Sequence, residues 1–125
     1  MSGWRPERVA EMVHRELAQR LREDVKDPDL GPISITGVDV SRDLGRAVVR
    51  FLPLGGGEAG PELDAALGRA ARTLRGPVGR ALRLRTAPEL VFVRDADLER
   101  AVRVTSLLDE VGRELRGAHR TEDEP

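Results

Sequence analysis

The 125-residue chain contains no cysteine, and its only aromatic residues are Trp4, Phe51 and Phe92. Without cysteine, disulfides and metal sites built from thiolates are excluded. Three rings are also too few for the aromatic platforms on which many single-strand binders stack one base after another. If the chain recognises a polyanion, it must therefore use cationic side chains, backbone amides and shape.

Long apolar runs are missing as well. No stretch approaches the ~20 apolar residues that a membrane-spanning helix needs. The N-terminal sequence, MSGWRPERVAEM, lacks the apolar core of a signal peptide. We therefore expect a cytoplasmic protein that has no membrane partner.

Histidine is scarce, because His14 and His119 are the only two. Metal binding and histidine-dependent acid–base catalysis need partners at fixed spacing, and neither histidine has them. The carboxylates are scattered in pairs that suit salt bridges on helices. We expect no catalytic residue, no metal and no cofactor, and hence a protein that is not an enzyme.

The chain is rich in charge, since 34% of its residues are charged and they nearly cancel to a formal net charge of -1. Residues 69–85 depart from this balance, because they contain no acidic residue and six arginines: Arg69, Arg72, Arg75, Arg80, Arg83 and Arg85. A charge run on a helix is most often a solvated face. A guanidinium fork also suits phosphate oxygens, so the cluster is a candidate electrostatic footprint for nucleic acid.

The first half of the chain shows one helical and two alternating patterns. From Pro6, apolar residues recur every four positions and predict an amphipathic helix of about 18 residues that ends by Asp27. Residues 33–40 and 46–52 alternate as strands, and turn residues between them predict a hairpin. The alternation changes phase at Gly37, which indicates a β-bulge.

The second half predicts helix, strand and helix. A glycine-rich connector at 53–60 leads to a helical segment, residues 61–84, that is broken inside. Glu89–Arg94 is a short buried strand, and Asp95 or Asp97 caps a last helix. A helical crossover joins the second and third strands, so these should lie parallel. The order helix–strand–strand–helix–helix–strand–helix predicts an α+β fold, with helices on one face of a three-stranded mixed sheet.

The length of the chain suits one domain with a single modest core. We expect this domain to cover residues 1–116. Residues 117–125 are polar and end in acidic groups, so they are expected to form a disordered tail.

This element order resembles the type II KH domain, an RNA-binding fold. Over roughly residues 5–111 the chain also resembles the bacterial ribosome-binding factor A family, through several separated motifs in the right order. These motifs are Arg8-Val9-Ala10, Lys26-Asp27-Pro28, VDVSRDL at 38–44, LRLRTAPEL at 82–90, DLER at 97–100 and LLDE at 107–110.

The resemblance implies a small assembly factor that binds the free, immature small ribosomal subunit. It would assist late maturation of the ribosomal RNA, notably in the cold, without enzymatic activity or cofactor. We expect a monomer that contacts ribosomal RNA through the six arginines of residues 69–85. The alternative is an adaptor that docks on another protein without touching RNA.

The family has an Ala-x-Gly kink between its two central helices. The aligned residues here are Ala70, Ala71 and Arg72, where arginine replaces the expected glycine. Pro77 follows Gly76, lacks an amide hydrogen and clashes with the preceding turn of a helix. We therefore expect the break near Gly76, and the alternative is an ordinary helix whose second half starts at Pro77.

Overall fold

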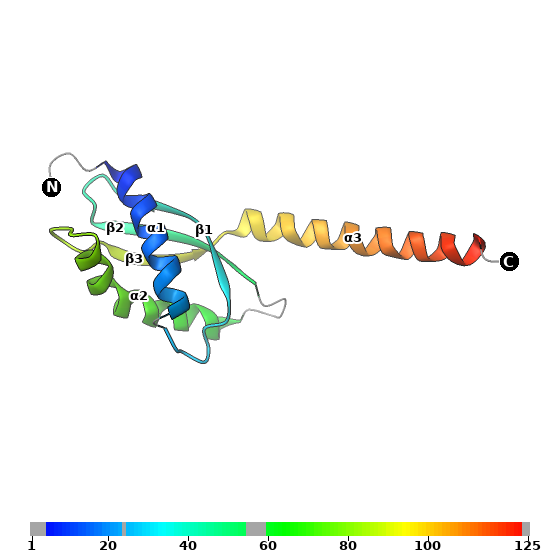
Figure 1. Cartoon of the computed structure of the whole chain (residues 1–125), viewed down its shortest axis with the longest axis horizontal. Helices are drawn as coiled ribbons and strands as arrows, with labels where there is room; N and C mark the ends of the chain where they lie inside the picture. Colours follow the sequence, from blue (N-terminus) through cyan, green and yellow to red (C-terminus); the bar gives the residue numbers. More distant parts are fainter. Residues whose placement is uncertain (1–4, 24, 55–59, 124–125) are drawn as a thin grey trace. The chain divides into compact units, whose positions relative to one another are not determined.

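The computed structural model describes residues 5–23, 25–54 and 60–123, with side-chain positions up to residue 117. Its elements in chain order are α1 (Pro6–Glu23), β1 (Ile33–Val40), β2 (Arg46–Pro53), α2 (Pro61–Ala81), β3 (Glu89–Arg94) and α3 (Ala96–Asp123) (Figure 1). The chain divides into two compact units, Met1–Arg94 and Asp95–Pro125. The predicted glycine-rich connector lies largely outside the described residues.

The first unit contains the whole sheet, in the order β1-β2-β3. β1 and β2 pair antiparallel, and β2 and β3 pair parallel, as predicted from the hairpin and the helical crossover. The β1–β2 register shifts between Ile35 and Gly37, which confirms the predicted bulge. The α+β class with a mixed three-stranded sheet is therefore confirmed.

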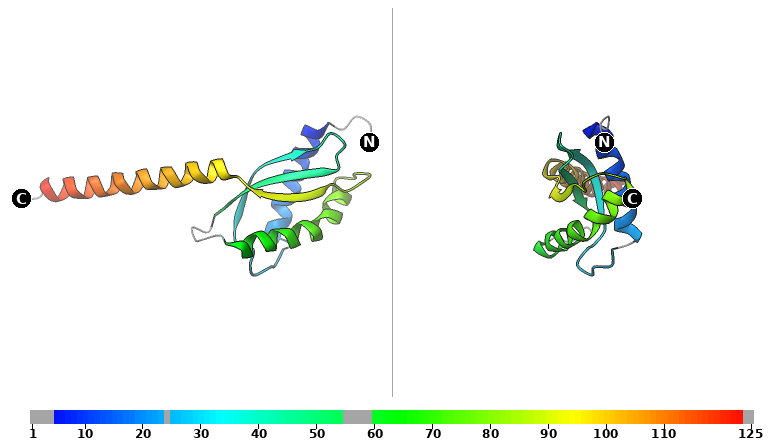
Figure 2. Two further views of the ribbon diagram at one scale, coloured as in Figure 1. Left: turned by 180° about the vertical axis from the view of Figure 1, so that it is seen from behind. Right: turned by 90° about the vertical axis from the view of Figure 1, so that its left-hand side faces the viewer.

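Both helices of this unit pack on the same face of the sheet (Figure 2). α1 buries apolar residues four positions apart, and β2 buries every second residue, as the periods of helix and strand require. The buried core is formed by Val9, Val13, Leu17, Ala47, Val49, Ala70, Ala71, Leu74, Val78 and Leu90. This core holds α2 against the sheet and fixes which of its residues face outward.

The β1–β2 turn is closed by local hydrogen bonds. Asp43 Oδ1 accepts from the Ser41 hydroxyl at 2.7 Å and from the Gly45 amide at 2.9 Å. Both hydrogen bonds lower the pKa of the Asp43 carboxyl, and the bond from the Ser41 hydroxyl has the larger effect. The Gly45 carbonyl accepts from the Glu89 amide at 2.9 Å, so the turn also anchors the start of β3.

The central helix differs from the prediction in one respect, the number of helices. Residues 61–81 form one continuous helix, α2, so the order has one helix there and not two, although Pro77 lies inside it. Proline removes one backbone hydrogen bond, the one that the Thr73 carbonyl would accept. Leu74 and Val78 on either side are buried in the core, and this packing outweighs the local loss. A bend of the axis at Ala70–Arg72 or Gly76–Pro77 stays a prediction.

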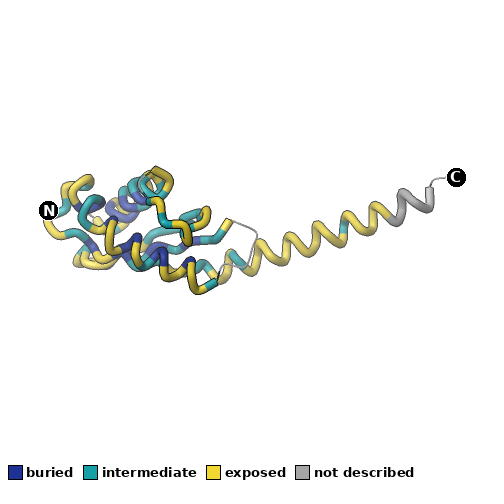
Figure 3. The backbone as a smooth tube through the Cα atoms, turned by 90° about the horizontal axis from the view of Figure 1, so that it is seen from below, coloured by how far each residue is buried: buried dark blue, intermediate teal, exposed yellow. Residues whose placement is uncertain are grey.

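The second unit is the single helix α3. The Leu98 amide donates to Asp95 Oδ1 at 3.1 Å, so Asp95 caps the helix as predicted. α3 continues beyond residue 116 to Asp123, and its described residues are almost all exposed (Figure 3). The division into a domain at 1–116 and a tail at 117–125 stays a prediction.

Candidate nucleic-acid interface

The exposed half of α2 carries four of the six predicted arginines. A helix advances about 100° per residue, which places Arg72 roughly opposite the buried side. By the same rotation Arg69 and Arg80 lie toward one flank, and Arg75 lies toward the other. The arginines therefore spread over the exposed half of the helix and do not form a single row.

Arg69 is engaged by two carboxylates of the segment that follows α1. Its Nε donates to Asp27 Oδ2 at 2.8 Å, and its Nη2 lies 3.4 Å from Asp29 Oδ2. The pKa of Asp27 is lowered, mainly by the hydrogen bond from Arg69 and then by the amide of Asp29. The same bond raises the pKa of Arg69. Arg69 therefore fastens this segment to α2.

Arg75 also has a structural contact. Its Nε donates to the carbonyl of Ala87 at 3.1 Å, in the loop between α2 and β3. A Cβ added to Gly79 would lie only 2.6 Å from the Ala87 Cβ, so the helix and this loop approach closely at glycine. Arg75 thus helps to hold the loop that carries Arg83 and Arg85.

Arg72 and Arg80 lie along the outside of α2. A Cβ on Gly76 would lie 3.1 Å from Arg80 Nη1, and one on Gly68 would lie 3.9 Å from Arg72 Nη1. Each guanidinium therefore runs back over a glycine one turn earlier, as helical side chains do. Neither side chain forms an ion pair or hydrogen bond within the described part of the chain.

Arg83 ends the helix in a left-handed conformation, with φ 55°. The amide of Arg83 donates to the Arg80 carbonyl at 3.1 Å, and the amide of Leu84 donates to the Gly79 carbonyl at 2.9 Å. This pair of bonds is the Schellman motif, in which glycine is the usual residue at the left-handed position. The turn places Arg83 and Arg85 on the exposed loop beyond α2.

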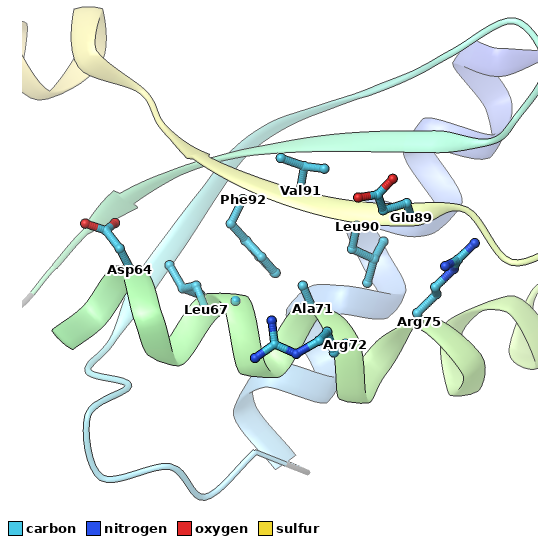
Figure 4. Close-up of a pocket in the computed structure, with 10 residues that line it drawn as sticks. Asp64, Leu67, Ala71, Arg72, Arg75, Glu89, Leu90, Val91 and Phe92 are labelled. Atoms are coloured by element: carbon cyan, nitrogen blue, oxygen red, sulfur yellow. The ribbon is translucent and has the colours of Figure 1, made fainter. Parts of the chain in front are cut away.

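A groove of about 450 Å³ lies beside these arginines, between α2 and β3 (Figure 4). Its floor is apolar and includes Leu67, Ala71, Leu90 and Phe92. The groove is also lined by four charged side chains, Asp64, Arg72, Arg75 and Glu89. In Figure 4, Leu90 and Phe92 point from β3 toward α2.

Some residues of this region were missed by sequence reasoning. Asp27 and Asp29 flank Pro28, and this spacing lets both carboxylates reach one guanidinium. Nothing in the sequence identifies that guanidinium as Arg69, which is 42 residues from Asp27. Gly79 is the point at which α2 approaches Ala87, and nothing in the local sequence indicates this contact.

Two other kinds of site are absent from the described residues. No helix there combines the length and the apolar character needed to cross a membrane. No group of three or more His, Cys, Asp or Glu residues in that part of the chain is arranged to hold a metal ion.

A family model described as ribosome-binding factor A matches residues 5–108. A ribosome-binding factor A from Thioalkalivibrio sulfidiphilus is 42% identical over 120 residues, which cover 96% of this chain and 93% of the relative. One from Heliobacterium modesticaldum is 44% identical over 111 residues, which cover 89% and 92%.

Solved structures give a similar result. The crystal structure of ribosome-binding factor A from Thermus thermophilus is 25% identical, with a TM-score of 0.62, and the match covers 73% of this chain and 97% of that one. A homology model of the Thermus thermophilus protein, fitted into a cryo-EM map of its complex with 30S, is 26% identical with a TM-score of 0.58. That match covers 70% of this chain and 92% of the other.

Proposed function

The chain belongs to the ribosome-binding factor A family, and on this basis we propose that it binds the small ribosomal subunit through arginines of α2 and the loop that follows. The contact is made with ribosomal RNA on the free, immature subunit, by a monomer in the cytoplasm. Binding assists late maturation of that RNA, including in the cold. The relative fitted into a 30S complex supports the choice of subunit.

One observation carries the proposal of direct RNA contact. Four guanidinium groups, those of Arg72, Arg80, Arg83 and Arg85, are exposed and have no side-chain partner among the described residues. A guanidinium left without a carboxylate can form bidentate hydrogen bonds with phosphate oxygens. Arg69 and Arg75 lie beside these four residues and hold the neighbouring segments in place. We name the four unpartnered residues the arginine surface.

The conformation of Arg83 supports a functional use of this surface. An L-residue in the left-handed region costs about 1–2 kcal/mol, and glycine would avoid that cost. Strained positions of this kind are concentrated at binding sites. A cation at this position is therefore consistent with selection for binding and not for stability.

The aromatic residues support recognition of phosphate and shape over stacking on bases. Phe51 is buried, and Phe92 is half-buried with its ring edge-on to Phe51 at a centroid distance of 6.4 Å. Neither ring lies open for a base on the arginine surface. The proposed contact therefore follows the charged outline of folded RNA.

The test is a triple charge reversal, Arg72→Glu, Arg80→Glu and Arg83→Glu. Co-sedimentation with purified small subunits should fall by at least about tenfold, since three phosphate contacts become repulsive. Circular dichroism should be unchanged, because all three side chains are exposed.

The matched control reverses three exposed arginines elsewhere, Arg15, Arg22 and Arg42. It makes the same change in net charge, and association should stay close to that of the original chain. Equal loss in both variants would mean that net charge governs binding. Unchanged association of the folded test variant would reject the arginine surface.

An adaptor function, without RNA contact, is the second candidate. It is favoured by one observation: seven apolar side chains of α3 are between 39% and 66% exposed, namely Leu98, Val102, Val104, Leu107, Leu108, Val111 and Leu115. Patches of this kind mark protein interaction sites. Association through these side chains should survive both ribonuclease and high salt. Association through the arginine surface should be lost after either treatment.

A further inference from the structure

The two edges of the sheet differ in how they are protected. β1 is interrupted by the bulge at Gly37 and carries Asp39, which forms an ion pair with Arg50. Bulges and charges of this kind discourage the addition of another strand. β3 is paired with β2 over its full length without a register shift, and its centre, Leu90–Val93, is entirely apolar.

The outer side of β3 is therefore open for pairing. Leu90–Val93 form a ladder with β2 on one side, and no other described strand pairs with them. The unpaired backbone groups of an edge strand are a template for an incoming strand. Such a strand would lie about 4.8 Å from β3.

The groove between α2 and β3 runs along this open edge. α2 presents small residues there, Gly68 and Ala71, which leave space beside the strand. A Cβ on Gly68 would meet nothing closer than Arg72 Nη1 at 3.9 Å. A free strand edge beside a helix is the geometry in which peptide-binding domains take up an extended peptide.

The charges in the groove indicate what the peptide should contain. Asp64 is neutralised by Arg94, because Asp64 Oδ1 lies 3.3 Å from Arg94 Nε. Glu89 is paired in the same way, with its Oε2 3.6 Å from Arg46 Nη2. Arg72 and Arg75 have no carboxylate partner in the described part of the chain. The uncompensated charge at the rim is therefore positive.

We propose that the edge of β3 and the α2–β3 groove bind an extended peptide of a partner protein, with alternating apolar and acidic residues. The peptide adds to the sheet as a fourth strand. Its backbone completes the ladder of Leu90–Val93. Because successive side chains of a strand face opposite sides of a sheet, its carboxylates point toward α2 and meet Arg72 and Arg75, and its apolar side chains lie beside Val91 and Val93 on the other face (Figure 4). A single half-buried ring makes the groove a poor stacking site for nucleic-acid bases, which favours the peptide.

The experiment uses the full chain and the octapeptide acetyl-Val-Glu-Val-Glu-Val-Glu-Val-Glu-amide, labelled for fluorescence anisotropy. Saturable binding should slow amide exchange in β3 and not in β1. The same peptide with lysine in place of glutamate should bind at least about tenfold more weakly. Failure of the glutamate peptide to bind at about 1 mM, or protection confined to other elements, would overturn the proposal.

Two variants of Gly68 separate the groove from the arginine surface. Gly68→Leu fills the groove and should weaken peptide binding at least about tenfold, whereas Gly68→Ala should change it less than about twofold. Because Gly68 is not part of the arginine surface, Gly68→Leu should still co-sediment with small subunits. Equal peptide binding by both variants would contradict a site in the groove.

The double reversal Arg72→Glu with Arg75→Glu tests the charge argument, and Arg80→Glu is its control outside the groove. The double variant should lose the peptide and the control should keep it. A single-stranded oligouridylate that binds the original chain and loses binding in Gly68→Leu would assign the groove to nucleic acid instead. The proposal would then be wrong.

Discussion

Arg83 shows how one residue can serve binding at a cost to stability. Its φ of 55° is the conformation that glycine adopts without strain. We predict that Arg83→Gly raises the free energy of unfolding by about 0.5–1 kcal/mol, after allowing for the greater freedom of glycine in the unfolded chain. Urea denaturation measures this gain, and co-sedimentation with small subunits should weaken at the same time.

Arg85→Gly is the control, since Arg85 has no positive φ. Arg85→Gly should weaken co-sedimentation with small subunits about as much as Arg83→Gly does, but its free energy of unfolding should not rise. If Arg83→Gly is no more stable than the original chain, the backbone at position 83 is not strained by arginine.

The ion pair of Asp27 with Arg69 makes stability depend on pH. The pKa of Asp27 is held below its ordinary value of 3.8 in the folded chain. The unfolded chain therefore binds the proton more readily, so this stabilisation is present above pH 3.8 and is lost as the pH falls through the folded pKa. We predict that the urea midpoint drops between about pH 5 and pH 2.5, and that Asp27→Asn drops less over this range.

Asp29→Asn is the comparison, because the carboxylate of Asp29 is the more distant of the two from Arg69. It should keep most of the pH dependence of the original chain. An identical pH profile for Asp27→Asn and the original chain would show that the ion pair makes no difference to folding.

Sequence reasoning finds the arginines and cannot assign their roles. Charge is visible one residue at a time, so the cluster at 69–85 is evident in the sequence itself. The role of Arg69 depends on Asp27, which the fold brings near it from a distant segment. The strain at Arg83 depends on where α2 stops, and helix boundaries are set by tertiary packing as much as by local preference.

At the scale of elements, α2 is positioned by its close approach to the following loop. A Cβ at position 79 would lie 2.6 Å from the Cβ and 3.1 Å from the Cα of Ala87. We predict that Gly79→Ala lowers the free energy of unfolding by about 1–3 kcal/mol, because helix and loop must separate. Thermal or urea denaturation measures the loss.

Gly68→Ala is the matched helical control. Its new methyl group meets Arg72 Nη1 at 3.9 Å, an ordinary contact, and alanine favours a helix over glycine by up to about 1 kcal/mol, so this variant should be more stable. Destabilisation by both substitutions to the same degree would mean that the Gly79 contact has no special part in placing α2.

The strands were easier to predict than the central helix. Alternation, turn residues and the phase change at Gly37 each have a local cause, and all three were confirmed. One helix stands where two were predicted, because the burial of Leu74 and Val78 is a tertiary effect that a local proline penalty does not include.

At the scale of the whole molecule, opposite charge is divided between the two units. Residues 1–94 contain 16 basic and 13 acidic residues, and residues 95–125 contain 5 basic and 9 acidic ones. The formal charges are therefore +3 and -4, and the total of -1 gives no general attraction to RNA. Binding to a polyanion must then depend on a local surface.

This locality gives a prediction about salt. If each of the four residues of the arginine surface neutralises one phosphate, a plot of the logarithm of the association constant against the logarithm of the salt concentration should have a slope of about -2.8 to -3.6. Arg72→Gln with Arg80→Gln should bring the slope to about half, whereas Arg15→Gln with Arg42→Gln should leave it unchanged.

Removal of residues 121–125 changes the formal charge from -1 to +2, since it deletes three carboxylates. The slope for the shortened chain should nevertheless stay within about 0.5 of the original, because counterions are released by the phosphate contacts themselves. A slope that follows net charge, and not the number of arginines on this surface, would contradict local recognition.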